Sequence, residues 1–215
     1  RAVVSGRELD VLYVGAGWQS EHLRAAPRPA DTEAGRATLS GKKLWFDDKF
    51  GRLNTEEKGA YLGVFEPEDR LLVIYTDGCY EITDQEMTQK FDPEKVLLIE
   101  RFDADKIITA VYADMKMLQY NVKRFKIETS TLKNKFLFIK EGEGNYLECV
   151  TTQPEPVLHV QSGKGQQVRS AKFKLAKVTE VMGWKTVGAK LLEYSPGVEM
   201  EWVEQDHHPT QQELF

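Results

Sequence analysis

The chain has 215 residues, of which 41% are hydrophobic and 29% are charged, and its formal net charge is −5. Such a length and composition suit a globular protein with one large domain or two small ones. They exclude a membrane-spanning helix, because no apolar run approaches about 20 residues. The acidic balance argues against a simple nucleic-acid-binding protein.

The N-terminal part separates from the rest. It lacks the long apolar stretch of a signal peptide, and a start at Arg1 indicates a fragment or a processed form. Within "DVLYVGAGWQSEHL" the glycines resemble a degenerate dinucleotide-binding motif, but Ser20 replaces its third glycine and Pro27 follows before a helix can form. We interpret this stretch as a strand and a turn. Residues 24–35, "RAAPRPADTEAG", have the composition of a linker.

From Arg36 onward, strand–turn–strand patterns recur. In "LLVIYTDGCYEIT" an Asp77-Gly78 step separates two strand-forming runs, and this is a strong hairpin signal because glycine accepts the positive φ of a tight turn. Helical periodicity is weak, and the best helix candidates are short pieces such as "TEEKGAYL" (55–62). We expect an all-β sandwich, barrel or bladed repeat. The predicted hairpins cover residues 42–54, 71–83, 106–128, 135–152 and 156–176.

Residues that could carry chemistry are scattered. The cysteines, Cys79 and Cys149, lie in separate predicted strands and are expected to be reduced, buried thiols. No metal-binding or nucleophile motif occurs among the four histidines (His22, His159, His207 and His208) or elsewhere, and the alternating acids of "FDADK" (102–106) suit a surface turn. We therefore expect no cofactor, no metal and no catalytic residue in this chain.

Charge is unevenly distributed. Residues 116–190 contain 14 Lys and Arg against 6 Asp and Glu, a net charge of +8, whereas the remaining residues carry a net charge of −13. A basic middle with acidic flanks can bind a polyanion through one face. Chance segregation on a solvated surface is the alternative.

Several linked stretches of residues 36–200 resemble a known family. They are "ATLSGKKLWFDDKFGRLN", "YLGVF", "DRLLVIYTDGCYEIT", "KVLLIERFDADKIITAVYAD", "YNVKRFKIETST" and "KFLFI". Together they resemble the C-terminal DNA-wrapping region of the A subunit of bacterial type IIA topoisomerases, of the topoisomerase IV or gyrase type found in Bacteroidetes-like bacteria.

The resemblance implies a fold and a function. The fold would be an all-β β-pinwheel of about three to four four-stranded blades over residues 36–200, possibly a partial wheel. It would follow an unplaced segment, residues 1–35, and precede an acidic flexible tail, residues 201–215. The region would bind and bend or wrap duplex DNA to direct strand passage, as part of an ATP-dependent topoisomerase whose active site lies in a missing N-terminal portion. Its partners would be the rest of the A subunit and the B subunit, in the cytoplasm and at the nucleoid.

Two features depart from the family. Gyrases carry a QRRGGKG box that positive wrapping requires, and "SGKGQQVR" (162–169) does not match it. This favours a topoisomerase IV-like subunit or a fragment that lacks the blade with the box. Residues 1–34 do not resemble the family.

Wrapping requires cations along a curved face that neutralise phosphates without reading bases. Strand alternation in "NVKRFKIE" predicts Arg124 on one face and Lys123 with Phe125 on the other. We predict the following DNA-binding residues: Lys116, Lys123, Arg124, Lys126, Lys133, Lys135, Arg169, Lys172 and Lys174.

Two further interpretations concern protein partners. The acidic flanks favour an alternative function, a β-propeller-like protein-interaction module without DNA binding. At the C-terminus, "QQELF" resembles the short peptides that bind bacterial sliding clamps, which would use Gln211, Leu214 and Phe215. A frayed chain end is the alternative for this segment.

Overall fold

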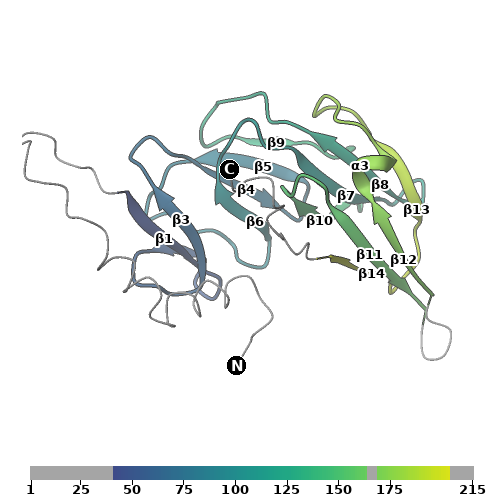
Figure 1. Cartoon of the computed structure of the whole chain (residues 1–215), viewed down its shortest axis with the longest axis horizontal. Helices are drawn as coiled ribbons and strands as arrows, with labels where there is room; N and C mark the ends of the chain where they lie inside the picture. The colour runs from purple at the N-terminus through teal and green to yellow at the C-terminus, as the bar shows by residue number, and fades with distance from the viewer. Residues whose placement is uncertain (1–40, 164–168, 204–215) are drawn as a thin grey trace, which may run out of the picture. The chain divides into compact units, whose positions relative to one another are not determined.

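The computed structural model describes residues 41–163 and 169–203. All of them belong to one compact unit, Ser40–Phe215. The described strands form four antiparallel sheets, two of four strands and two of three (Figure 1). The one described helix is the single turn α3, Leu175–Val178. The expected all-β fold is confirmed, and the sheets do not close into a ring.

We name the sheets blades A to D in chain order. Blade A has the order β2-β1-β3, blade B β6-β4-β5-β9, blade C β10-β7-β8-β13 and blade D β12-β11-β14. The bounds in blades A and B are β1 Lys42–Asp47, β2 Arg52–Asn54, β3 Ala60–Phe65, β4 Leu71–Tyr75, β5 Cys79–Thr83, β6 Val96–Arg101 and β9 Lys135–Leu137. Those in blades C and D are β7 Ile108–Asp114, β8 Gln119–Phe125, β10 Tyr146–Thr151, β13 Ala189–Glu193, β11 Val157–Ser162, β12 Arg169–Lys174 and β14 Glu199–Trp202.

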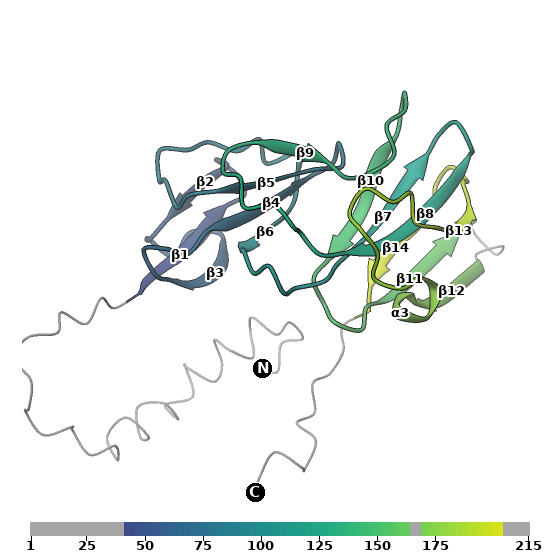
Figure 2. The same cartoon turned by 90° about the horizontal axis from the view of Figure 1, so that it is seen from above.

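The blades follow one another in space in chain order (Figure 2). Three apolar cores hold them together. Strand β4 shows how alternation builds two of them. Leu71, Val73 and Tyr75 pack in the core shared with blade A, whereas Leu72 and Ile74 pack in the core shared with blade C. The third core lies between blades C and D. Blades B and C therefore bury both faces, which explains why β4 and β7 are buried at every position.

The blades exchange strands by a repeated rule. After the hairpin of one blade, the chain returns to the preceding blade and pairs with the second strand of its hairpin. Strand β9 joins β5 in this way after the β7–β8 hairpin, and β13 joins β8 after the β11–β12 hairpin. In blade A a single bridge, Arg52 to Lys90, occupies the equivalent place. The blades are thus interlocked through residues far apart in the sequence.

Most sequence-based elements are confirmed, and two are wrong. The hairpins at 42–54, 71–83, 106–128 and 156–176 form as β1–β2, β4–β5, β7–β8 and β11–β12. The run 135–152 is not a hairpin, because β9 pairs in blade B and β10 pairs in blade C. The helix candidate 55–62 is a loop, residues 55–59, followed by the first three residues of β3. Gly59, with φ of 85°, precedes this strand and packs against the backbone of Phe46, where a Cβ would lie 2.1 Å from the Phe46 carbonyl oxygen.

Candidate nucleic-acid interface

The two lateral edges of the blades carry opposite charge. One edge consists of Lys90 and strands β9, β13 and β12, and we call it the basic edge. The other consists of β3, β6, β10 and β14, and we call it the acidic edge. The cations of the basic edge are Lys90, Lys135, Lys190, Arg169, Lys172 and Lys174, with one carboxylate, Glu193. The acidic edge carries Glu100, Glu148, Glu199 and Glu201, with one cation, Arg101.

Side-chain contacts between neighbouring blades place the basic edge on the same side. Lys133, just before β9, forms an ion pair of 2.8 Å with Glu86, which lies on the segment that reaches Lys90. The ring of Phe136 in β9 lies 6.2 Å from that of Trp184, on the segment that leads into β13. The cations of neighbouring blades can therefore meet one continuous ligand.

Blade D exposes the densest basic group on this edge. Strand β12 pairs with β11 on one side, and in the described part of the chain its other side has no partner strand. Arg169, Lys172 and Lys174 are exposed, and no ion pair within the described ranges neutralises them. The side chains at 172 and 174 share one face of the strand, because alternate residues point to the same side.

Lys135 is placed differently from the cations of β12. Its Nζ lies 3.8 Å from the centroid of the Tyr75 ring, which is a cation–π geometry. The contact holds the ammonium at a fixed place on the exposed edge of blade B, and Lys135 stays a candidate phosphate ligand.

Lys123 does not lie on the surface, contrary to expectation. Its side chain is 1% exposed, and its Nζ donates hydrogen bonds of 2.5–2.6 Å to the carbonyl oxygens of Phe138, Trp184 and Thr186. The ammonium also lies 5.2 Å from the centroid of the Phe125 ring, so the predicted alternation of the strand is confirmed. Burial lowers the pKa of Lys123 to about 8. Lys123 joins three chain segments and cannot reach a phosphate.

Arg124 is also engaged within the protein. It is 7% exposed, and its guanidinium donates to Thr109 Oγ1 at 3.3 Å and to the Pro154 carbonyl oxygen at 2.9 Å. Strand β8 lies between β7 and β13 and is therefore not at a blade edge. Arg124 ties β8 to the start of blade D.

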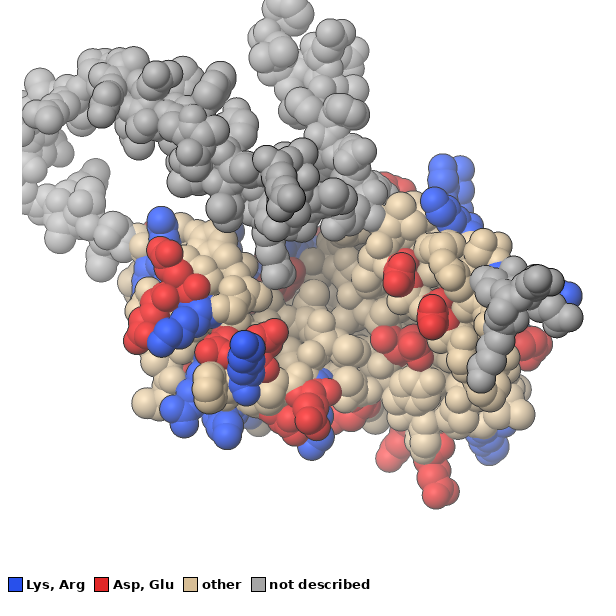
Figure 3. Space-filling model, turned by 90° about the horizontal axis from the view of Figure 1, so that it is seen from below, with Lys and Arg blue, Asp and Glu red and all other residues tan. Residues whose placement is uncertain are grey.

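The remaining predicted residues lie apart from this edge or are neutralised. Lys126 forms an ion pair of 3.6 Å with Asp105, and Lys133 contacts Asp84 and Glu86. Lys116 lies in the β7–β8 turn. On the face shown in Figure 3, Lys and Arg alternate with Asp and Glu and form no continuous basic surface. On this face the two signs of charge are therefore mixed, whereas the two edges differ in the sign of their charge.

The described residues hold no group of His, Cys, Asp and Glu that could bind a metal ion, and within the same ranges no helix is long and apolar enough to span a membrane. Both cysteines are free thiols. Burial, followed by the charge of Asp77, raises the pKa of Cys79 to about 11. Gln211, Leu214 and Phe215, the residues predicted to bind a sliding clamp, lie outside the described residues.

Comparison with solved structures defines the fold. The chain matches a structure described as the C-terminal domain of DNA topoisomerase IV, with a TM-score of 0.53 and 11% sequence identity. The match covers 76% of this chain and 61% of the other, so this chain spans less than two thirds of that domain. The fold is that of the topoisomerase C-terminal β-pinwheel, here with unclosed blades.

The sequence assigns the family. Residues 52–196 match the model of the topoisomerase C-terminal domain of Bacteroidota, and the chain therefore belongs to this family. No curated protein matches the chain.

Proposed function

We propose that this chain is the C-terminal region of a type IIA topoisomerase A subunit and that it binds and bends duplex DNA along its basic edge. The observation that carries the proposal is the separation of charge between the two edges. Phosphates are neutralised by Lys and Arg, and the release of their counterions supplies affinity without base readout. Bending a short site by 40–90° costs on the order of 1–6 kcal/mol, which several such contacts can offset.

The remaining parts of the proposal follow from this assignment. The region has no catalytic role of its own, and strand cleavage belongs to another part of the subunit. It works with the remainder of the A subunit and with a B subunit, in the cytoplasm at the nucleoid. Binding of a sliding clamp through the C-terminal "QQELF" stays a prediction. The domain limits, with a pinwheel over 36–200 between an unplaced segment and an acidic tail, are proposed as well.

A pair of triple variants tests DNA binding. In the first, Lys135, Lys172 and Lys174 on the basic edge are changed to Ala. In the matched control the same number of charges is removed from ion-paired lysines elsewhere, Lys95, Lys106 and Lys126. Affinity for duplex DNA is measured as a function of salt concentration for unrelated sequences.

We expect the basic-edge variant to flatten the log–log salt dependence by about 2–3, because each phosphate contact contributes about 0.9. The control should keep most of the wild-type slope, because its lysines are already neutralised. Equal losses in both variants would show that binding is diffuse over the surface. No binding by the wild type would favour the alternative, a protein-interaction module, for which the acidic edge is the supporting observation.

A further inference from the structure

The turn between β1 and β2 presents an aromatic side chain to solvent. Phe50 is 68% exposed, more than any other large hydrophobic residue in the described part of the chain. A single exposed apolar residue is common on protein surfaces. Phe50 differs because it lies on a rigid turn and beside two cations that form no ion pair with any residue in the described ranges.

Hydrogen bonds fix the turn from both sides. The carboxylate of Asp47 accepts from the backbone N–H groups of Lys49 and Phe50 at 2.9 and 3.1 Å. Gly51 donates to the Asp47 carbonyl oxygen and accepts from the N–H of Phe91, both at 2.8 Å. Gly51 has φ of 64°, and a Cβ there would lie 1.9 Å from the Phe91 carbonyl oxygen. The turn therefore holds the backbone of Phe50 in place, and little conformational entropy is left to lose on binding.

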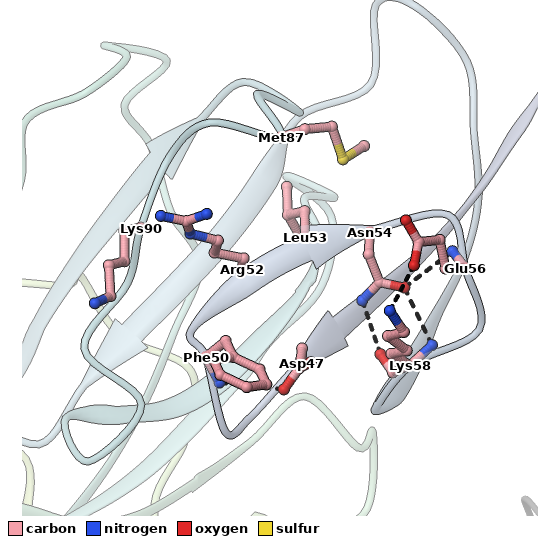
Figure 4. A pocket seen from close by; sticks show the side chains of 9 residues that line it. All are labelled: Asp47, Phe50, Arg52, Leu53, Asn54, Glu56, Lys58, Met87 and Lys90. Carbon is pink, nitrogen blue, oxygen red and sulfur yellow. Dashed lines mark hydrogen bonds and ion pairs between the residues drawn. The ribbon is translucent and has the colours of Figure 1, made fainter.

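Two cations lie beside the turn. The backbones of Arg52 and Lys90 form an isolated antiparallel β-bridge. Together with Phe50 the two residues line a hollow of about 480 Å³ (Figure 4). Like charges directly opposite each other on neighbouring strands are destabilising. The carboxylates that line the same hollow are engaged elsewhere, Asp47 with the turn and Glu56 with Lys58 at 2.6 Å. The pair thus offers two positive charges to an anion from outside.

We propose that this corner of blade A kinks the DNA: Arg52 and Lys90 bind phosphates that flank one base step, and the ring of Phe50 inserts into the minor groove at that step. This inference rests on the proposed DNA-binding function and adds a specific site to it. An apolar wedge partly unstacks a base step and bends the duplex toward the major groove. Pyrimidine–purine steps such as TA unstack most easily. The site should therefore prefer a TA step although it makes no base-specific hydrogen bond.

The test uses Phe50→Ala in the full chain, with Tyr61→Ala as the matched control. Tyr61 is also an exposed aromatic residue of blade A, at 47%, but it belongs to the acidic edge. Two end-labelled 30-base-pair duplexes are compared, one with a central TA step and one without TA or CA steps. Bending is measured by energy transfer, and affinity is measured as a function of salt. A third variant, Arg52→Ala with Lys90→Ala, tests the phosphate contacts, and thermal unfolding checks all variants.

We expect wild type and Tyr61→Ala to bend the duplex with the TA step more than the duplex without TA or CA steps. Phe50→Ala should lose this difference but keep the salt dependence, because no phosphate contact is removed. The double variant should flatten the log–log salt slope by about 1–2. If Phe50→Ala bends DNA as wild type does, the wedge is refuted while DNA binding stands. A lower melting temperature of Phe50→Ala with unchanged bending would show that Phe50 packs within the protein, and it would refute the wedge too. If the wild type binds neither duplex, the proposed function itself fails.

Discussion

At the scale of single residues, burial decides what a lysine does. Lys123 and Lys126 are three residues apart, yet Lys123 is 1% exposed and donates to three backbone carbonyl groups, whereas Lys126 is exposed and pairs with Asp105, whose side chain is 96% exposed. Removing the Lys123 ammonium would leave three carbonyl oxygens without their buried donor, which lowers the free energy of unfolding. A solvated ion pair contributes little to stability.

We therefore expect Lys123→Met to lower the free energy of unfolding by about 2–4 kcal/mol. The matched change Lys126→Met should alter it by less than about 0.5 kcal/mol. Urea unfolding followed by circular dichroism measures both. Similar stability of the two variants would contradict the role of Lys123 as a buried tie between segments.

The shifted pKa of Lys123 predicts that the free energy of unfolding depends on pH. Burial lowers the pKa of Lys123 from 10.5 to about 8 in the folded chain. Between these values the unfolded chain binds more protons, so the free energy of unfolding rises with pH. We expect wild type to gain stability relative to Lys123→Met between about pH 8 and pH 10.5. A relative loss over this range would mean that the hydrogen bonds to the carbonyl groups outweigh burial.

At the scale of elements, the β4–β5 hairpin combines a local turn signal with a tertiary contact. Gly78 has φ of 77°, and a Cβ there would lie 2.3 Å from Ile139 Cγ1, next to the returning strand β9. Gly197 has the same φ, with no atom within 4 Å of its Cβ position. Comparing alanine substitutions at these two glycines therefore separates the free-energy cost of the positive φ from the cost of the steric clash with Ile139.

We expect Gly197→Ala to destabilise the protein by about 1 kcal/mol, the cost of a positive φ in a residue with a Cβ. Gly78→Ala should cost about 2–3 kcal/mol, because Ile139 must also move. Thermal or urea unfolding compares them directly. Equal losses would show that the core near Ile139 yields without cost.

At the scale of the whole molecule, the basic edge runs across four blades. Packed sheets are spaced about 10 Å apart, so four of them span roughly 30–40 Å, or about ten base pairs at about 3.4 Å per base pair. We expect the salt dependence of binding to steepen with duplex length up to roughly 10–15 base pairs and then to level off. Titrations with duplexes of about 8, 12, 16 and 30 base pairs would measure this. A slope that is already maximal at about 8 base pairs, which span roughly 27 Å, would show that binding does not use all four blades.

The structural features that could be predicted from the sequence are local. Four hairpins, their alternation and the all-β class followed from strand-forming runs and short turns, because neighbouring residues decide these features. The resemblance to the topoisomerase C-terminal region also came from the sequence and was confirmed by the family match over residues 52–196.

Contacts between blades, in contrast, set which strands pair across blades and which cations face solvent. The run 135–152 has the pattern of a hairpin, yet β9 and β10 satisfy their backbone hydrogen bonds in different blades. Lys123 and Lys172 both lie on alternating strands, but β8 lies inside a sheet between two apolar cores and β12 lies at an edge. Alternation assigns each side chain to a face of its strand, whereas packing between blades decides whether that face is buried.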